Sequence, residues 1–304
     1  MDPIAAGARG LAQLIAGRGP AAPLGTAKAV NTALITQAKR ARNLIPRLTE
    51  LDVDLSAVQV GAVSRADWLD GASSAAQRTI GDISGLPEVP LVPLIYSFMA
   101  RNVMGQYEPI TDTIMLVSPN LYHFEREYGL EREELALWTA AHEFTHAAQY
   151  RVAPWIQETL AGYVISGVNK GDKKATENIN ALMSLLEGHA EYIMNTVPHR
   201  IVPSRRRLDM SMLDRRNRRS RLQHVFECFG LNSKAEQYEQ GRAFVQAVVA
   251  QVGLRGLNQV WEKSENAPTL YEIYRPSLWV ERVVYGASEE EAAENSQDSQ
   301  GVAQ

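Results

Sequence analysis

The sequence predicts a mainly helical protein with a small amount of β-structure, an α+β fold. Apolar residues recur at helical spacing through most of the 304-residue chain. One segment, 105–121, instead has the pattern of a β-hairpin, because a turn-like PITD separates GQYE from the strand-like TIMLV. The composition, 45% hydrophobic and 22% charged, is that of a globular protein able to form a sizeable core.

Helices are expected on both sides of the hairpin. Before it, apolar periodicity predicts helices at 26–48 and 67–80. After it, proline, glycine and polar breaks define helices at 131–151, 155–168, 176–196, 207–229, 234–252 and 269–284. We therefore expect a flexible segment at 1–25 (with room for one short helix), a single domain at 26–285 and an acidic disordered tail at 286–304.

Cysteine content, apolar runs and the distribution of arginines argue against disulfide-bonded, membrane-spanning and nucleic-acid-binding proteins. The single cysteine, Cys228, excludes an intrachain disulfide and a cysteine-based zinc cluster. No apolar run reaches about 18 residues and the N-terminus lacks the pattern of a secretory signal, so we expect no membrane span and a cytoplasmic location. Nine arginines lie between Arg200 and Arg221, but no aromatic residue lies there to stack on a base. We interpret this segment as a solvated helix surface and do not expect nucleic-acid binding.

The stretch LWTAAHEFTHAAQY, at 137–150, places two histidines four residues apart with a glutamate directly after the first. On a helix, His142 and His146 lie one turn apart on one face and can bind one zinc ion through one nitrogen each. Glu143 lies about 100° around the helix, where its carboxylate can act as the general base of a hydrolase. The H-E-x-x-H pattern also occurs by chance, so a third ligand must distinguish a zinc site from a coincidence.

A later helix offers the third ligand. Gln149 and Val152 occupy the positions at which the extended metzincin motif has glycine and histidine, which excludes that class. In ALMSLLEGHAEYIMN, at 181–195, Glu187 and Glu191 are four residues apart on one face of an apolar helix. Buried carboxylates need a cation or a partner, so we favour Glu187 as the zinc ligand and Glu191 as a partner of a ligand histidine.

His189 is the alternative third ligand, although on an ideal helix it points about 200° away from Glu187. Between them lies Gly188, and a glycine in mid-helix often marks a close approach of two backbones. We therefore expect Gly188 to bring this helix against the helix that carries His142. Three further residues are candidates for stabilising an oxyanion in a cleft: Tyr192, His199 and Arg200.

The two stretches LWTAAHEFTHAAQY and MSLLEGHAEYIMN together resemble the bacterial zincin-like metallopeptidase family, many of whose members are described as hydrolases associated with deazaflavin coenzyme biosynthesis. The likeness covers about 60–285 and includes DWLDG, GQYEPI, LVSPNL, GLNQVWE and PSLWVERV. The resemblance implies a zincin-like helical core and Zn²⁺ held by His142, His146 and Glu187, with Glu143 as the catalytic base. It names no substrate.

Two functions follow from these expectations. The first is a zinc-dependent hydrolase, a metallopeptidase that acts on a peptide or another amide. The alternative is a non-catalytic zincin-fold protein that binds or scaffolds a biosynthetic enzyme complex. Glu143 favours the enzyme, because a protein without turnover has no need for a carboxylate at that position. The sequence predicts no oligomeric state, and we expect the hairpin to lie beside the metal site, where a peptide could dock by adding a strand.

Overall fold

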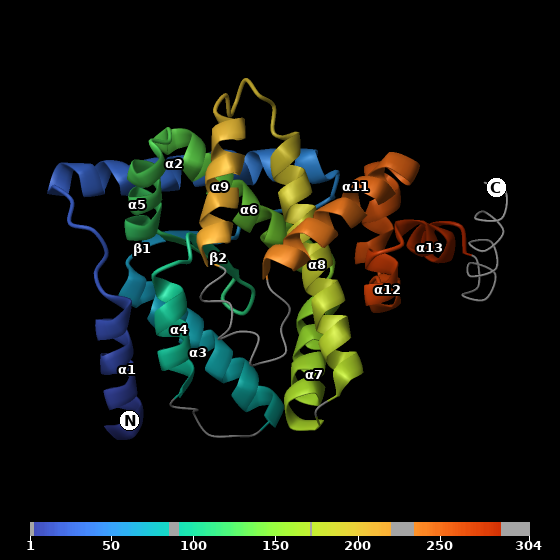
Figure 1. Ribbon diagram of the computed structural model, residues 1–304, viewed down its shortest axis with the longest axis horizontal. Coiled ribbons are helices and arrows are strands. Elements are labelled where there is room, and N and C mark those ends of the chain that lie inside the picture. Colours follow the sequence, from blue (N-terminus) through green and yellow to red (C-terminus); the bar gives the residue numbers. More distant parts are fainter. Residues whose placement is uncertain (1–2, 85–90, 171, 220–233, 287–304) are drawn as a thin grey trace. The chain divides into compact units, whose positions relative to one another are not determined.

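The computed structural model describes residues 3–84, 91–170, 172–219 and 234–286 (Figure 1). Almost all of the predicted acidic tail, Cys228 and the end of the helix predicted at 207–229 lie outside these residues. Contacts divide the chain into two compact units. One comprises Met1–Pro46, Asp54–Ala147 and Val197–Arg215, and the other comprises Arg47–Val53, Ala148–Thr196 and Arg216–Gln304. The single domain expected at 26–285 stays a prediction.

The first unit contains a three-stranded sheet of β1 (Gln59–Val63), β2 (Gly105–Glu108) and β3 (Thr113–Val117), in the order β1-β3-β2. β2 and β3 pair antiparallel, with Tyr107 opposite Ile114, so the predicted hairpin is confirmed. The turn between them contains Asp112 at a φ of 48°, a left-handed conformation that aspartate tolerates better than most residues. β1 was not predicted and pairs parallel with β3. As a result β2 is an edge strand of the described sheet.

The first unit also contains α1 (Pro3–Ala16), α3 (Arg65–Ser84), α4 (Leu91–Ala100) and α5 (Ser118–Tyr128), and most of α2 (Leu24–Thr49), α6 (Arg132–Val152) and α9 (Arg205–Arg219). Among these helices, α3 and α5 contact the strands of the sheet. The helices predicted at 26–48 and 67–80 are confirmed as α2 and α3. The end of the segment predicted as a hairpin, 118–121, is wrong, because α5 begins there. Pro119 cannot donate to a strand ladder and suits the first turn of a helix.

A small core joins the sheet to α1, α3 and α4. It contains the indole of Trp68 and the side chains of Leu69, Met115 and Val117, all buried. Ala12 of α1 packs into the same cluster, which accounts for the helix found in the segment expected to be flexible. Burial of these apolar side chains holds α1 on the unit despite its glycine-rich sequence.

The second unit contains α7 (Trp155–Lys170), α8 (Lys173–Thr196), α11 (Lys234–Asn258), α12 (Leu270–Ile273), α13 (Pro276–Trp279) and the π-helix Val280–Val284 (Figure 1). The prediction of one continuous helix at 269–284 was wrong, because the helix is interrupted at Arg275, which has a φ of −136°. A residue before proline is disfavoured in the helical region, and Pro276 then starts a new helix. α11 runs beyond its predicted end but is kinked at Gly253.

Gly188 contacts a different helix from the one expected. A Cβ atom at Gly188 would lie 2.1 Å from the carbonyl carbon of Gly241 in α11, and one at Gly241 would lie 1.9 Å from the carbonyl oxygen of Ser184. The two glycines therefore let the backbones of α8 and α11 touch. The expectation of close approach was correct, but the partner helix was wrong, because a glycine in the sequence does not show which helix approaches it.

No helix among the described residues is long and apolar enough to cross a membrane.

Candidate metal centre

Helix α6 supplies the first three residues of the site. It begins with Glu133 and Glu134 in its first turn and ends with Arg151 in its last, so the charges suit the helix dipole at both ends. Small buried side chains such as Ala140 and Ala147 line its middle and allow close packing. α6 also belongs to both units, since the first unit ends its central segment at Ala147 and the second resumes at Ala148.

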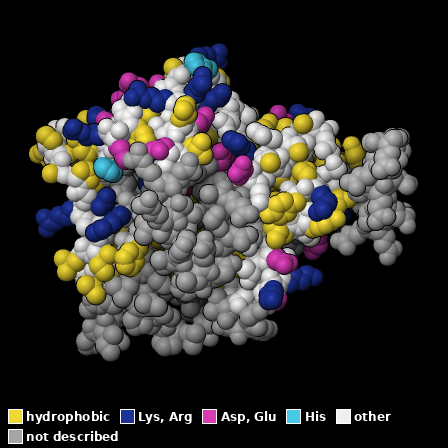
Figure 2. All heavy atoms as spheres, viewed as in Figure 1, with side chains coloured by type: hydrophobic (Ala, Val, Ile, Leu, Met, Phe, Trp, Pro, Cys, Tyr) yellow, Lys and Arg dark blue, Asp and Glu magenta, His cyan; other side chains and the backbone are white. Residues whose placement is uncertain are grey.

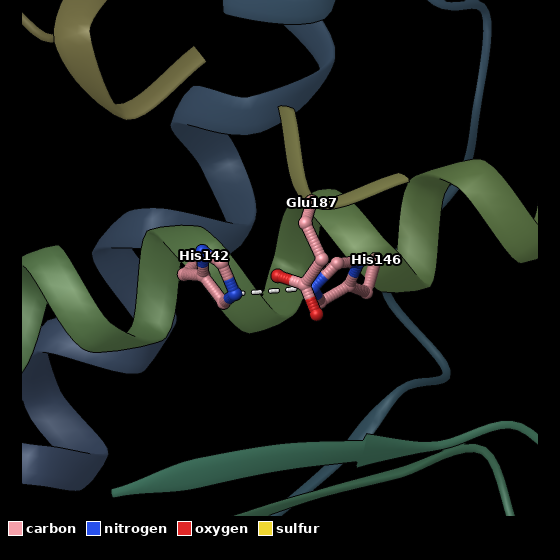
Figure 3. A group of neighbouring side chains, drawn as sticks. All are labelled: His142, His146 and Glu187. Atoms are coloured by element: carbon pink, nitrogen blue, oxygen red, sulfur yellow. Dashed lines mark hydrogen bonds between the residues drawn. The ribbon is translucent and has the colours of Figure 1, made fainter. Parts of the chain in front are cut away.

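His142 and His146 turn their imidazole rings toward each other on α6 (Figure 3). Their Nε2 atoms are 3.1 Å apart, and the two rings are perpendicular. Two nitrogens bound to one tetrahedral zinc ion at the usual distance would be about 3.3–3.4 Å apart. The two side chains therefore have nearly the spacing that a shared metal ion requires.

Glu187 of α8 completes a group of three possible ligands. One ligand atom from each of His142, His146 and Glu187 lies within 4.8 Å of the others. Figure 3 shows the Glu187 carboxylate directed at the two imidazoles. Two imidazoles and one carboxylate form the donor set of many catalytic zinc sites, which keep a fourth position open for water or substrate. The residues present therefore fit zinc, and His189 is not in this group among the described residues.

Glu143 lies on the same helix but faces strand β2. Its Oε2 accepts a hydrogen bond of 2.8 Å from the backbone N–H of Tyr107, and the side chain is only 5% exposed. A Cβ atom at Gly105 would lie 2.7 Å from Oε1, so the glycine leaves the space that the carboxylate occupies. The hairpin thus contacts the helix that carries the two histidines, through β2, while peptide docking beside the metal site stays a prediction. Neither Gly105 nor Tyr107 was predicted as a site residue, because a backbone donor leaves no signal in the sequence.

The hairpin holds a second buried carboxyl group. Burial raises the pKa of Glu108 above its usual value, while the N–H of Ile110 and the charge of Arg78 partly lower it. Burial and the neighbouring Glu108 raise the pKa of Tyr96 in turn. Both residues belong to the first unit, and burial is the largest cause of each pKa shift.

The remaining predicted residues lie in other surroundings. Glu191 forms an ion pair of 3.5 Å with Arg242 of α11, and its role as a partner of a ligand histidine stays a prediction. Tyr192 packs partly buried against the core of the second unit. His199 and Arg200 are exposed just after α8. Oxyanion stabilisation by these last three residues also stays a prediction.

The arginine-rich segment makes structural contacts where it is described. Arg205 donates to the carbonyl of Val197, and Arg215 donates to the carbonyl of Asn102 and lies over the ring of Phe124. In the view of Figure 2, basic and acidic side chains are interspersed on the described part of the surface. These contacts agree with the interpretation of a helix surface and give no support to a nucleic-acid interface.

Comparison with known proteins identifies a family and a similar structure. The model of the zincin-like metallopeptidase family matches residues 92–170 and 166–280. A protein from Chloroflexus aurantiacus, described as a "putative hydrolase with a novel fold", has a similar structure with a TM-score of 0.73. It is 27% identical, and the similarity covers 90% of this chain and 96% of that chain. No curated protein matches the sequence. The predicted fold class, mainly helical with a small sheet, is confirmed.

Proposed function

Because the chain belongs to the zincin-like metallopeptidase family, we propose that it is a zinc-dependent hydrolase that cleaves a peptide or another amide. The main support is the group formed by His142, His146 and Glu187. Three ligand side chains of this type leave an open coordination position, which distinguishes catalytic zinc sites from closed structural ones.

His142, His146 and Glu187 would hold the metal. A bound zinc ion supplies a Lewis acid that polarises a carbonyl group and lowers the pKa of water. Glu143 would remove a proton from the attacking water and deliver it to the leaving nitrogen. We assign the proton to Oε1, because Oε2 accepts the N–H of Tyr107. That hydrogen bond fixes the direction of the carboxylate, and the Glu143 side chain, only 5% exposed, has little contact with bulk water.

Strand β2 would orient the substrate. It is an edge strand of the described sheet, and an extended peptide can bind by adding a strand to such an edge. A peptide paired with β2 would use other edge groups of the strand, because Glu143 already accepts the N–H of Tyr107, and it would lie beside that carboxylate. The substrate bond would then lie beside the base that must act on it.

A zinc-dependent cleavage assay tests the proposal. The zinc-loaded chain, incubated with a diverse pool of peptides, should give cleavage products that mass spectrometry detects. A chelator should abolish these products and added zinc should restore them, because the chemistry requires the ion. A chain that binds zinc and peptides but cleaves none of them would favour the non-catalytic alternative. Cleavage that persists in chelator would contradict a metal-dependent mechanism.

A further inference from the structure

We propose that Gln149 and His189 are positioning residues: they hold the turn of α8 that carries Glu187, so that its carboxylate is kept in position to bind the metal together with the histidines of α6. This inference rests on the proposed ligand role of Glu187 and adds the means by which that ligand is held. Both side chains are fully buried, and neither has a part in the chemistry described so far. In the sequence, Gln149 served only to exclude the metzincin class.

The hydrogen bonds of Gln149 define the pair. Its Nε2 donates to the carbonyl oxygen of Leu186 at 2.9 Å and lies 2.9 Å from Nδ1 of His189. The carbonyl oxygen can only accept, so the atom facing it is the amide nitrogen and not the amide oxygen. Each of the two N–H groups of that nitrogen therefore has one acceptor. Nδ1 of His189 must be one of them, which places the ring proton on Nε2.

These bonds join two helices at the positions that matter for the metal. On α6, Gln149 follows His146 by three residues and lies on the same face. On α8, Leu186 directly precedes Glu187. One side chain thus connects the helix of the histidine ligands to the peptide group before the carboxylate ligand. A sliding or rotation of α8 along α6 would break both hydrogen bonds.

The same turn of α8 is held from its other sides within the second unit. Gly188 touches the backbone of α11 at Gly241, so α8 cannot move toward α11. The imidazole of His189 packs against the indole of Trp261, with ring centroids 5.2 Å apart. Leu186–His189 is therefore fixed by the amide of Gln149 on one side and by α11 and Trp261 on others.

A polar pair in this position calls for a reason beyond packing. An amide and an imidazole must lose water on burial, and apolar side chains of similar size would pack without that cost. A metal ligand, in contrast, must be held within about 0.5 Å of its working position, and directional hydrogen bonds achieve this better than apolar contacts. The geometry also argues against His189 as the third ligand, because its Nδ1 accepts from Gln149.

Three variants test the pair by zinc affinity, measured by competition with a chromogenic chelator. Gln149→Met keeps the length of the side chain but removes both donors, and His189→Leu removes the acceptor. Each should weaken zinc binding by about 10–100-fold, the range for groups that orient metal ligands. His189→Asn should recover most of this loss, because the Asn Oδ1 can accept at about the position of Nδ1. The absorption spectrum of the Co²⁺-loaded chain should change in Gln149→Met and His189→Leu.

Asn120→Leu is the matched control. Asn120 is also a buried amide whose Nδ2 donates to two backbone carbonyls, those of Ala100 and Val103, at 2.8 and 2.6 Å. It lies on α5 in the first unit and supplies no candidate ligand. Its replacement should lower the melting temperature of the metal-free chain, while zinc affinity and the Co²⁺ spectrum stay as in the wild type. A role limited to general stability would instead affect all buried-amide variants alike.

The outcomes separate this inference from the proposed function. If Gln149→Met and His189→Leu bind zinc with wild-type affinity and an unchanged Co²⁺ spectrum, the positioning role is wrong. The proposed ligand set is then tested separately, by the loss of zinc affinity expected in Glu187→Gln. If His189→Asn loses zinc as completely as His189→Leu while Gln149→Met keeps it, His189 is itself a ligand and the inference fails. If Gln149→Met does not fold, the comparison of His189→Asn with His189→Leu decides alone.

Discussion

Glu187→Gln should bind zinc more than about 100-fold more weakly than the wild type, a larger loss than that of an orienting group. The glutamine oxygen is neutral, so the site loses a charged donor and keeps only the two imidazoles. The weaker binding should also reduce the amount by which zinc stabilises the folded chain. At free zinc about 1,000 times the wild-type Kd, binding stabilises the fold by about 4.1 kcal/mol, and a 100-fold weaker site leaves about 1.4 kcal/mol. Melting curves with and without zinc measure this difference.

Glu191→Gln is the control for that experiment, because it removes a carboxylate from the same face of α8, four residues away. Glu191 pairs with Arg242 and is absent from the candidate ligand group, so its zinc affinity should fall far less than that of Glu187→Gln. Full zinc binding by Glu187→Gln, together with loss of zinc in His189→Leu, would show that the third ligand was assigned wrongly.

Glu143→Gln should keep its zinc and lose its turnover. The amide oxygen can still accept the N–H of Tyr107, so the side chain should stay in place, but it cannot take a proton from water. General acid–base catalysis contributes about 10²–10⁴-fold, and hydrolysis of any substrate found by the cleavage assay should fall by that factor. Zinc content and melting temperature should stay near the wild-type values. Loss of zinc in this variant would make Glu143 a ligand and would remove the basis for its role as a base.

The helices were predictable where apolar periodicity is long and its breaks are clear. α2, α6, α7 and α8 all lie close to their predicted bounds. β1 was not predictable in the same way, because its five residues pair in parallel with β3, far along the chain, and its local pattern is weak. The helix expected at 269–284 failed for a local reason that the sequence does contain, the proline at 276.

The candidate metal ligands could be predicted from the sequence, but the residues that position the site, such as Gln149 and Gly105, could not. Two histidines and a glutamate at helical spacing limit what the residues can bind, and Glu187 followed from the cost of burying a carboxylate. The roles of Gln149 and Gly105 depend on which backbone atoms lie opposite them, at Leu186 and at Glu143. That information comes from the register of packed helices and strands. From the sequence alone, Gln149 excludes the metzincin motif and is a polar residue on the face that carries the histidines, and neither fact shows which atoms it contacts.

Zinc content tests the central claim most directly, and it requires no knowledge of the substrate. The full-length chain, loaded with zinc and dialysed, should retain about one zinc ion per chain by elemental analysis, because the three candidate ligand atoms on α6 and α8 lie within 4.8 Å of one another. His146→Ala should retain close to none, since it removes one of the two imidazoles. A wild-type chain that holds no zinc after loading, or a His146→Ala variant that holds as much as the wild type, would contradict the account.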